Sequence, residues 1–430
     1  MATRWIRSIF ALAALAAACT LQAEGLLRAG LSKVDITPGV SMPMYGYRNR
    51  SCGPSSGVHD PLFAKILVLE AGDSRMAILT VDLGTLMSEK LRRDLAEKLG
   101  IPLVLMAASH THSGPLFLPA SDEAPSAPSP YLAEIEEKIF GAVQAATRSM
   151  FPARFTVGRG AIQLGYNRLQ VGEDGRARAV FNNLERIPYG PVDPEYMLLG
   201  VEDQSGKLRA LLVHYACHSV VLGPSNCKYS ADYPGVLQAV VEKSIPGLQC
   251  MFVQGAAGDI NPLFLARTKN EEQDFAIVRK MGETLAGAVL RSVKSMQPAE
   301  PVLRPIRFVS ERLTFSERWD KTKKVEVGIT TVLLSPSIAI AAMPGEALHK
   351  LQRMWKEQAD VAWPFFYGYT WSAGGGWPGY IPDLRSAAYG GYGADNATRI
   401  EVGAGEMLLL RHLIHLYQLQ GRWLDQPGKP

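Results

Sequence analysis

Residues 103–115 read Leu103-Val104-Leu105-Met106-Ala107-Ala108-Ser109-His110-Thr111-His112-Ser113-Gly114-Pro115, an apolar run that stops at two histidines. The run is short and rich in branched residues, which predicts a buried strand. His110 and His112 then lie at its carboxyl end, the edge of an α/β sheet where ligands usually bind. Residues two apart in extended backbone point to one side, so both imidazoles can serve one cavity. The pattern alone fits a hydrogen-bonded structural pair as well as a metal site, and its place at a strand end favours the metal.

Apolar runs of similar length recur along the chain, with amphipathic patterns between them. Strands are predicted at residues 62–69, 76–81, 103–106, 154–157, 197–201, 208–213 and 250–253, with a hairpin over 325–342. Helices are predicted at 131–148, 236–243 and about 272–290, from near Glu346, and over about 406–419. This alternation predicts an α/β fold in which helices flank a mixed β-sheet core.

The organisation of the chain favours one large domain. Its 430 residues suggest about three domains by length alone. However, the sequence contains no internal repeat and no break in composition that would mark a linker. The one Pro/Ser/Ala-rich stretch, residues 119–130, follows the histidine motif and is interpreted as a loop at the rim of a site.

The first 23 residues are typical of a signal peptide. Arg4 and Arg7 supply the positive region, residues 9–21 a short apolar stretch, and Leu21-Gln22-Ala23 a small-x-small cleavage pattern. Residues 24–430 are then the mature domain, exported to the periplasm or secreted. A lipoprotein anchor at Cys19 is the minority alternative, because the leucine expected three residues before it is missing.

Composition excludes several classes of partner. The chain has 45 basic and 41 acidic residues and no Lys/Arg-rich run, so no nucleic acid is expected. No apolar run is long enough for a transmembrane segment. A small-molecule or lipid substrate is compatible with this composition, which does not itself select one.

Four cysteines remain after the leader, and an oxidising compartment allows them three pairings that the sequence cannot distinguish. Cys217 lies in an apolar run and is interpreted as a buried thiol. The full set is Cys52, Cys217, Cys227 and Cys250.

A second histidine motif, His214-Tyr215-Ala216-Cys217-His218, also closes an apolar run. His214 falls within the strand pattern and is better explained as a core histidine. His218 lies beyond the run and is the stronger ligand candidate. Two strand-end histidine motifs far apart in sequence together indicate a zinc site.

The remaining donors are less clear from the local pattern. Glu346 follows Pro344-Gly345, where a carboxylate could bind a metal or cap a helix. The turn Gly255-Ala256-Ala257-Gly258-Asp259-Ile260-Asn261-Pro262 could bring backbone close to a ligand or be a tight turn shaped by Asp259. It lacks the Gly-Lys-Ser/Thr ending of a P-loop.

Taken together and in order, these motifs resemble the neutral ceramidase family, zinc amidases that cleave the N-acyl bond of ceramide in sphingolipid metabolism. The resemblance runs from about Gly30 to about Glu406. It rests on Asp35-Ile36-Thr37-Pro38, His59-Asp60-Pro61-Leu62, Thr80-Val81-Asp82, His110 to Pro115, Asn167-Arg168, His218 to Asp232, Gly258 to Pro262, Pro344-Gly345-Glu346, and Gly379-Tyr380 with Tyr389 and Tyr392.

The resemblance implies a Zn²⁺ cofactor and a set of site residues. The implied metal ligands are His110, His218, Glu346 and Tyr380. The implied catalytic residues are His112 as oxyanion stabiliser or proton donor, Arg168 on the substrate carbonyl, and Tyr392 on the developing oxyanion. Zinc would make hydroxide available, and these donors would meet the charge that develops on attack.

Two departures from the family concern the substrate. Asn261 stands where ceramidases carry a serine with a nucleophilic or anchoring role, so a mechanism that needs that serine is excluded. The sequence also reaches Pro430 without the C-terminal β-sandwich domain of longer members.

Two alternatives follow from these departures. The first is a zinc enzyme acting on a glycan or another acylated envelope substrate, which the aromatic segment 367–380 with Trp371 and Trp377 would suit as well as a lipid. The second is a binding protein that keeps the fold without the reaction.

Overall fold

A large mixed sheet forms the centre of the computed structural model, which describes residues 27–117, 129–303 and 305–422. The predicted signal peptide, Cys19 and most of the predicted loop 119–130 lie outside the described residues. In spatial order the strands are β13 (Gln249–Gln254), β11 (Leu208–Tyr215), β10 (Glu195–Asp203), β6 (Phe151–Ala161), β1 (Arg28–Asp35), β3 (Phe63–Ala71), β4 (Ser74–Val81), β5 (Leu103–Ala108) and β21 (Thr370–Trp371), with β15 (Gln297–Pro298) beside β6.

Among the described residues, backbone pairing joins the two halves of this sheet where Arg28 and Ala29 of β1 pair with β6. Each half contains one parallel pair, β4 with β5 and β11 with β13, and each pair is joined through a helix. The joining helices are α2 (Glu89–Leu99) and α4 (Asp232–Ser244). Because β13 also lies against β4 and β5, the strand ends that carry the two histidine motifs come together.

A second sheet of four strands packs on one face of the first. Its strands, in order, are β16 (Arg307–Ser316), β17 (Lys324–Ser335), β18 (Ile338–Ala342) and β20 (Trp363–Tyr367). Val332, Ile340 and Phe365 of this sheet share one apolar core with Leu105 and Leu212 of the large sheet. The core thus lies between two sheets. The apolar pattern along each strand does not reveal this arrangement.

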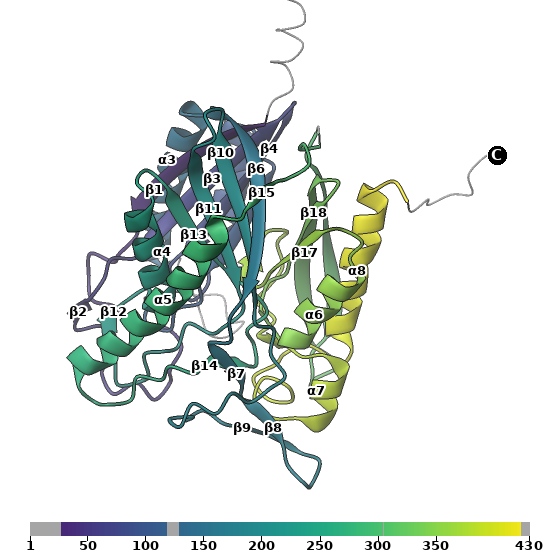
Figure 1. The fold of residues 1–430 in the computed structure, drawn as a ribbon. Coiled ribbons are helices and arrows are strands. Elements are labelled where there is room, and N and C mark those ends of the chain that lie inside the picture. Colours follow the sequence, from purple (N-terminus) through teal and green to yellow (C-terminus); the bar gives the residue numbers. More distant parts are fainter. Residues whose placement is uncertain (1–26, 118–128, 304, 423–430) are drawn as a thin grey trace, which may run out of the picture.

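Helices cover the two outer faces, so the layers run helix, sheet, sheet, helix (Figure 1). Helices α2 and α3 (Pro130–Arg148) pack on one half of the large sheet, and α4 and α5 (Glu271–Val293) on the other. Helices α6 (His349–Gln358) and α8 (Ala404–Leu419) cover the small sheet. Local signals explain some of the boundaries, since Ser88 caps α2 through the N–H of Leu91 and Gly100 ends it at a φ of 64°.

Short paired strands position the loops. They are β2 (Gly57–Val58) with β12 (Lys228–Tyr229), β7 (Gly165–Asn167) with β14 (Ile260–Pro262), β8 (Leu169–Val171) with β9 (Ala177–Ala179), and β19 (Glu346–Ala347) with β22 (Tyr380–Ile381). The short helix α7 (Leu384–Tyr389) follows β22.

The predicted α/β class with a mixed sheet flanked by helices is confirmed. Each predicted strand and the hairpin over 325–342 are present. The helix expected near Glu346 begins instead at His349, because Glu346 pairs with Tyr380 as part of β19. In the described part of the chain, no helix has the length and hydrophobicity to cross a membrane.

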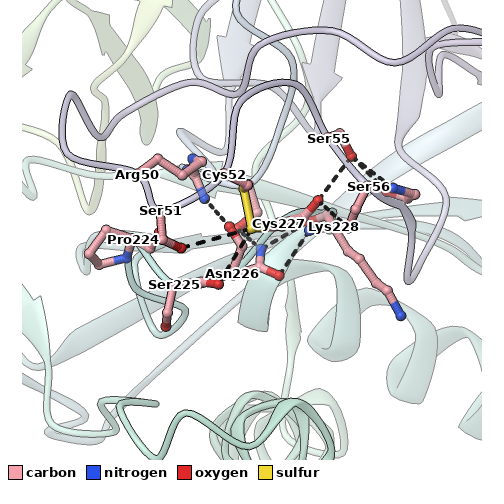
Figure 2. Close-up of a disulfide and its surroundings, with 12 residues drawn as sticks. Arg50, Ser51, Cys52, Ser55, Ser56, Pro224, Ser225, Asn226, Cys227 and Lys228 are labelled. Carbon is pink, nitrogen blue, oxygen red and sulfur yellow. Dashed lines mark hydrogen bonds between the residues drawn. A yellow bond between two sulfur atoms is a disulfide. The ribbon is translucent and has the colours of Figure 1, made fainter.

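The cysteines form one disulfide, between Cys52 and Cys227, across a sequence separation of 175 residues (Figure 2). Cys217 and Cys250 are free and buried, as interpreted for Cys217. Beside the disulfide, the guanidinium of Arg50 donates hydrogen bonds to the carbonyl oxygens of Asn226 and His112. The bridge therefore holds a loop that is attached directly to the histidine motif.

Candidate functional site

Two histidines and a glutamate converge at the carboxyl ends of the large sheet. Nε2 of His218 lies 3.0 Å from Oε2 of Glu346, and Nε2 of His110 lies 3.4 Å from the same oxygen. His110 follows β5, His218 follows β11, and Glu346 lies on β19 after the small sheet. Their exposed fractions are 1%, 0% and 7%. Both sheets therefore contribute to this cluster.

The opposite nitrogen of each ring is held by a backbone carbonyl. Nδ1 of His110 is 2.7 Å from the oxygen of Gly84, and Nδ1 of His218 is 2.5 Å from that of Ala257. A carbonyl can only accept, so Nδ1 must carry the proton and Nε2 of the neutral ring presents a lone pair. This is the usual way in which histidine ligands of a metal are oriented. The donor set around Glu346 therefore fits a metal ion.

The neighbouring histidines keep the carboxyl group of Glu346 ionised although it is buried. Burial acts to raise the pKa of Glu346, but His110 and His218 outweigh it and hold that pKa well below its usual range. Burial lowers the pKa of His218. His110 adopts a φ of 59°, a backbone conformation that non-glycine residues seldom adopt outside functional sites.

His112 is the third imidazole of the cluster. Its Nε2 lies 3.3 Å from Nε2 of His110, and the ligand atoms of His110, His112 and His218 all lie within 4.8 Å of one another. Unlike the other two, its Nδ1 has no hydrogen-bond partner among the described residues. Burial, followed by the neighbouring His110 and His218, holds its pKa well below the usual value. His112 is thus a neutral ring that reaches the cluster without a carbonyl to orient it.

Tyr380 reaches the cluster through backbone pairing, since β22 places it directly beside Glu346. Its ring stacks on that of His218 at 6.5 Å between centroids, and it is 6% exposed. Burial raises the pKa of Tyr380 well above its usual value, while Arg168 acts to lower it.

Arg168 lies between β7 and β8 and is 4% exposed. Its Nη1 donates to Oδ1 of Asn261 at 3.1 Å and its Nη2 to the carbonyl of Gly258 at 2.6 Å. Burial acts to lower its pKa, but Tyr380 and Glu346 outweigh this and leave the pKa raised. Asn261 is therefore a hydrogen-bond acceptor for the guanidinium and holds Arg168 in place.

Tyr392 lies at the mouth of the site and is 38% exposed. Its ring contacts those of Tyr380 and Phe181 edge-on, at 5.4 Å and 5.3 Å between centroids. The guanidinium of Arg168 lies 5.1 Å from its ring centroid. All seven residues implied by the sequence resemblance thus form one continuous set of contacts.

Comparison with known proteins identifies the family. The model for neutral/alkaline non-lysosomal ceramidase, N-terminal, matches residues 27–276. This chain belongs to that family. A neutral ceramidase from Pseudomonas aeruginosa is 26% identical over 253 residues, which are 55% of this chain and 37% of that protein. The matched part therefore spans little more than a third of the length of the curated relative.

Solved ceramidase structures share the fold. A crystal structure of the neutral ceramidase from Pseudomonas aeruginosa superposes with a TM-score of 0.74 at 17% identity, covering 94% of this chain and 76% of that one. A ceramidase complexed with C2 superposes with a TM-score of 0.73 at 16% identity, covering 94% and 77%. The two-sheet architecture is therefore that of the ceramidases.

The aromatic segment 367–380 supplies part of the wall of this ceramidase-family site. The ring of Tyr369 lies 4.4 Å from that of His110, and Trp377 stacks on His110 at 6.5 Å between centroids. Sequence analysis named Trp377 as a substrate-facing candidate, whereas it did not single out Tyr369. Trp371, by contrast, is 3% exposed and belongs to the core.

Other motif residues support the ceramidase-like scaffold. Asp60 accepts hydrogen bonds from the hydroxyl of Ser230 and from the N–H of Ala231, and Asp232 accepts from the N–H of Leu222. His214 is fully buried beside Phe365, and burial lowers its pKa to about 3. These groups fix loops or fill the core rather than face the cluster.

Proposed function

We propose that this chain is an exported zinc-dependent amidase that cleaves an N-acyl bond, with a ceramide-like lipid as the first candidate substrate. The observation that supports it most strongly is the convergence of the Nε2 atoms of His110 and His218 on one carboxylate oxygen of Glu346. With Tyr380 adjacent, these are nitrogen and oxygen donors of the kind that hydrolytic zinc sites use.

The metal ligands in this proposal are His110, His218, Glu346 and Tyr380. A zinc ion held by them supplies Lewis acidity and activates water near neutral pH. The carbonyls of Gly84 and Ala257 keep both imidazoles in the tautomer that can bind a metal.

The catalytic residues in this proposal are His112, Arg168 and Tyr392. His112 stabilises the oxyanion or protonates the leaving amine, because its Nε2 lies at the cluster, 3.3 Å from Nε2 of His110. Arg168 orients the substrate carbonyl from a position fixed by Asn261 and Gly258. The phenol of Tyr392 donates to the developing oxyanion at the mouth of the site.

Export is supported by the leader-like residues 1–23 and by the Cys52–Cys227 disulfide, since disulfides persist mainly in oxidising compartments. Periplasmic release, secretion and anchoring at Cys19 are distinguished by fractionation of cells that express the full chain. A C19S variant that stays in the membrane fraction would exclude the anchor.

A glycan or other acylated envelope substrate is the second candidate, favoured by the half-buried Trp377 beside His110. Aromatic faces of this kind pack against sugar rings as readily as against acyl chains. Asn261 in place of the family's serine also separates this chain from ceramidases.

The test is an assay of purified, zinc-loaded protein on short-chain N-acylsphingosine and on N-acylated and O-acylated sugars. Release of fatty acid from N-acylsphingosine supports the first candidate, and release from the sugars alone supports the second. Zinc-loaded protein that hydrolyses none of them would contradict the amidase proposal and favour the binding protein. H112Q is the matched inactive control.

A further inference from the structure

A second cavity of about 350 Å³ lies away from the metal cluster. It is bounded by the β8–β9 hairpin, the start of α6 and helix α7, near the lower end of the view in Figure 1. Among its described lining residues are none of His110, His112, His218 and Glu346. Its volume is in the range of small-molecule sites.

A buried aspartate–histidine pair forms part of the cavity wall. Nδ1 of His349 is 2.6 Å from Oδ2 of Asp259, whose Oδ1 accepts the backbone N–H of His349 at 2.8 Å. Asn167 donates to the same carboxylate at 2.9 Å. His349 and Asp259 are 5% and 1% exposed. The imidazole is therefore held in one orientation.

The other ring nitrogen of His349 has no partner. Nε2 is buried and makes no hydrogen bond among the described residues, although His349 lines the cavity. Burial acts to lower the pKa of His349, but the charge and hydrogen bond of Asp259 outweigh it and leave the pKa raised. A buried polar atom without a partner costs free energy, and Nε2 has almost no surface open to the cavity that His349 lines.

The charges around the cavity are predominantly positive. Lys350 and Arg353 of α6 and Arg385 of α7 line it. Of the two carboxylates in the lining, Asp259 is committed to His349, and Asp383 caps α7 and accepts from the hydroxyl of Ser386 at 2.6 Å. Arg353 is ion-paired with Glu357 at 3.3 Å, so Lys350 and Arg385 are the lining cations that an anionic ligand could neutralise.

Other residues that line the cavity are apolar. Leu169 and Val171 of β8, Ala177 of β9, and Pro191 line it, together with the ring of Tyr389. A free inorganic ion would make no use of these apolar side chains, whereas an anion that carries a hydrocarbon part contacts both them and the cations.

We propose that this cavity binds an organic anion, a carboxylate carried on a short apolar chain, with the head between Lys350 and Arg385 and beside His349. The site is independent of the reaction proposed above. It shares a wall with the reaction site, because the N–H of Arg168 donates to the carbonyl of Asp259 at 2.8 Å.

The test is calorimetric titration of the zinc-loaded protein with octanoate. Acetate, which has the carboxylate without the chain, and octanol, which has the chain without the carboxylate, are titrated for comparison. Octanoate should bind at least about tenfold more tightly than either. The exposed double variant K350Q/R385Q should weaken octanoate binding at least about tenfold, while the matched control R279Q/K280Q on α5 should not change it.

Two further measurements locate the ligand. Octanoate should shift the ¹⁵N resonances of the His349 ring, and H349Q should weaken binding; if H349Q does not fold, the double variant decides. Binding should persist in H218A, which removes a proposed zinc ligand. The proposal would be overturned if octanoate did not bind or bound no better than octanol. It would also be overturned if K350Q/R385Q left octanoate binding unchanged, or if binding required His218.

Discussion

Nε2 of His218 lies 3.0 Å from Oε2 of Glu346, although Nδ1 of the same ring already contacts the carbonyl of Ala257. If Nδ1 donates to that carbonyl, a neutral imidazole presents a lone pair to a carboxylate, and the two atoms repel unless a cation lies between them. His110 shows the same arrangement, with Nε2 3.4 Å from Oε2 of Glu346 and Nδ1 2.7 Å from the carbonyl oxygen of Gly84. The geometry is therefore that of ligands around one positive charge.

Replacing His112 with glutamine tests whether this residue acts in the reaction without binding the metal. We expect H112Q to retain zinc near the wild-type level and to lose about 100-fold or more in kcat, because a general acid or oxyanion donor is removed. Zinc content by plasma mass spectrometry and turnover of N-acylsphingosine check this. If H112Q loses its zinc as H110A does, His112 is a ligand and its proposed role is wrong.

The substitution Arg168→Lys tests the planar, two-nitrogen contact with Asn261 and Gly258. Lysine keeps the charge but cannot donate from two fixed nitrogens, so we expect kcat/KM to fall about 100-fold. Arg178→Lys on β9, whose side chain is 67% exposed, is the control and should leave kcat/KM unchanged. Equal activity of both variants would contradict the role of Arg168.

The disulfide should contribute strongly to stability because it closes a loop over 175 positions of sequence. C52S/C227S should lower the free energy of unfolding by about 2–4 kcal/mol in urea denaturation.

The free thiols should be unreactive in the native state, because burial raises the pKa of Cys250 to about 12 and that of Cys217 well above its usual value. In a chain beginning at Glu24, a thiol reagent should detect neither before unfolding and both after it. Rapid labelling of the native chain would contradict the burial of these cysteines.

His412 makes stability depend on pH. Burial lowers its pKa to about 3 in the folded chain, with His415 adding to the effect, against about 6.5 when unfolded. Between these values the unfolded chain binds a proton that the folded chain does not. The free energy of unfolding therefore falls as the pH is lowered, by about 2 kcal/mol at pH 5.

The variant H412N should flatten this slope, because the amide can still meet the hydroxyl of Thr331 that Nδ1 contacts at 2.8 Å. Urea denaturation at pH 7.5 and pH 5 measures the difference from wild type. A slope unchanged in H412N would show that another group is responsible.

Much of the fold follows from local patterns. The run over 103–108 is a strand because branched apolar residues suit a sheet that is buried on both faces. The stacking of a second sheet was not predictable, because Val332 and Ile340 have the same apolar pattern whichever layer they face. Glu346 lies on a strand rather than at a helix start because β22, 34 positions later, supplies its partner.

The site residues could be predicted where a local sequence motif contains the side chains that would bind the metal. Two histidines at strand ends indicated a metal, but nothing local selects Tyr380, which is adjacent to Glu346 only through β-pairing. The family resemblance supplied that residue. The cavity at His349 had no sequence signal, because the pairing of Asp259 with His349 depends on a turn and a helix that meet only in the folded chain.

The central claim is most directly tested by the zinc content of the purified chain, measured for wild type, H110A, H218A and H59A. We predict about one zinc per chain in wild type and in H59A, and its near-complete loss in H110A and H218A while both remain folded by circular dichroism. Wild-type protein that binds no zinc, or H110A and H218A proteins that keep it, would contradict the account.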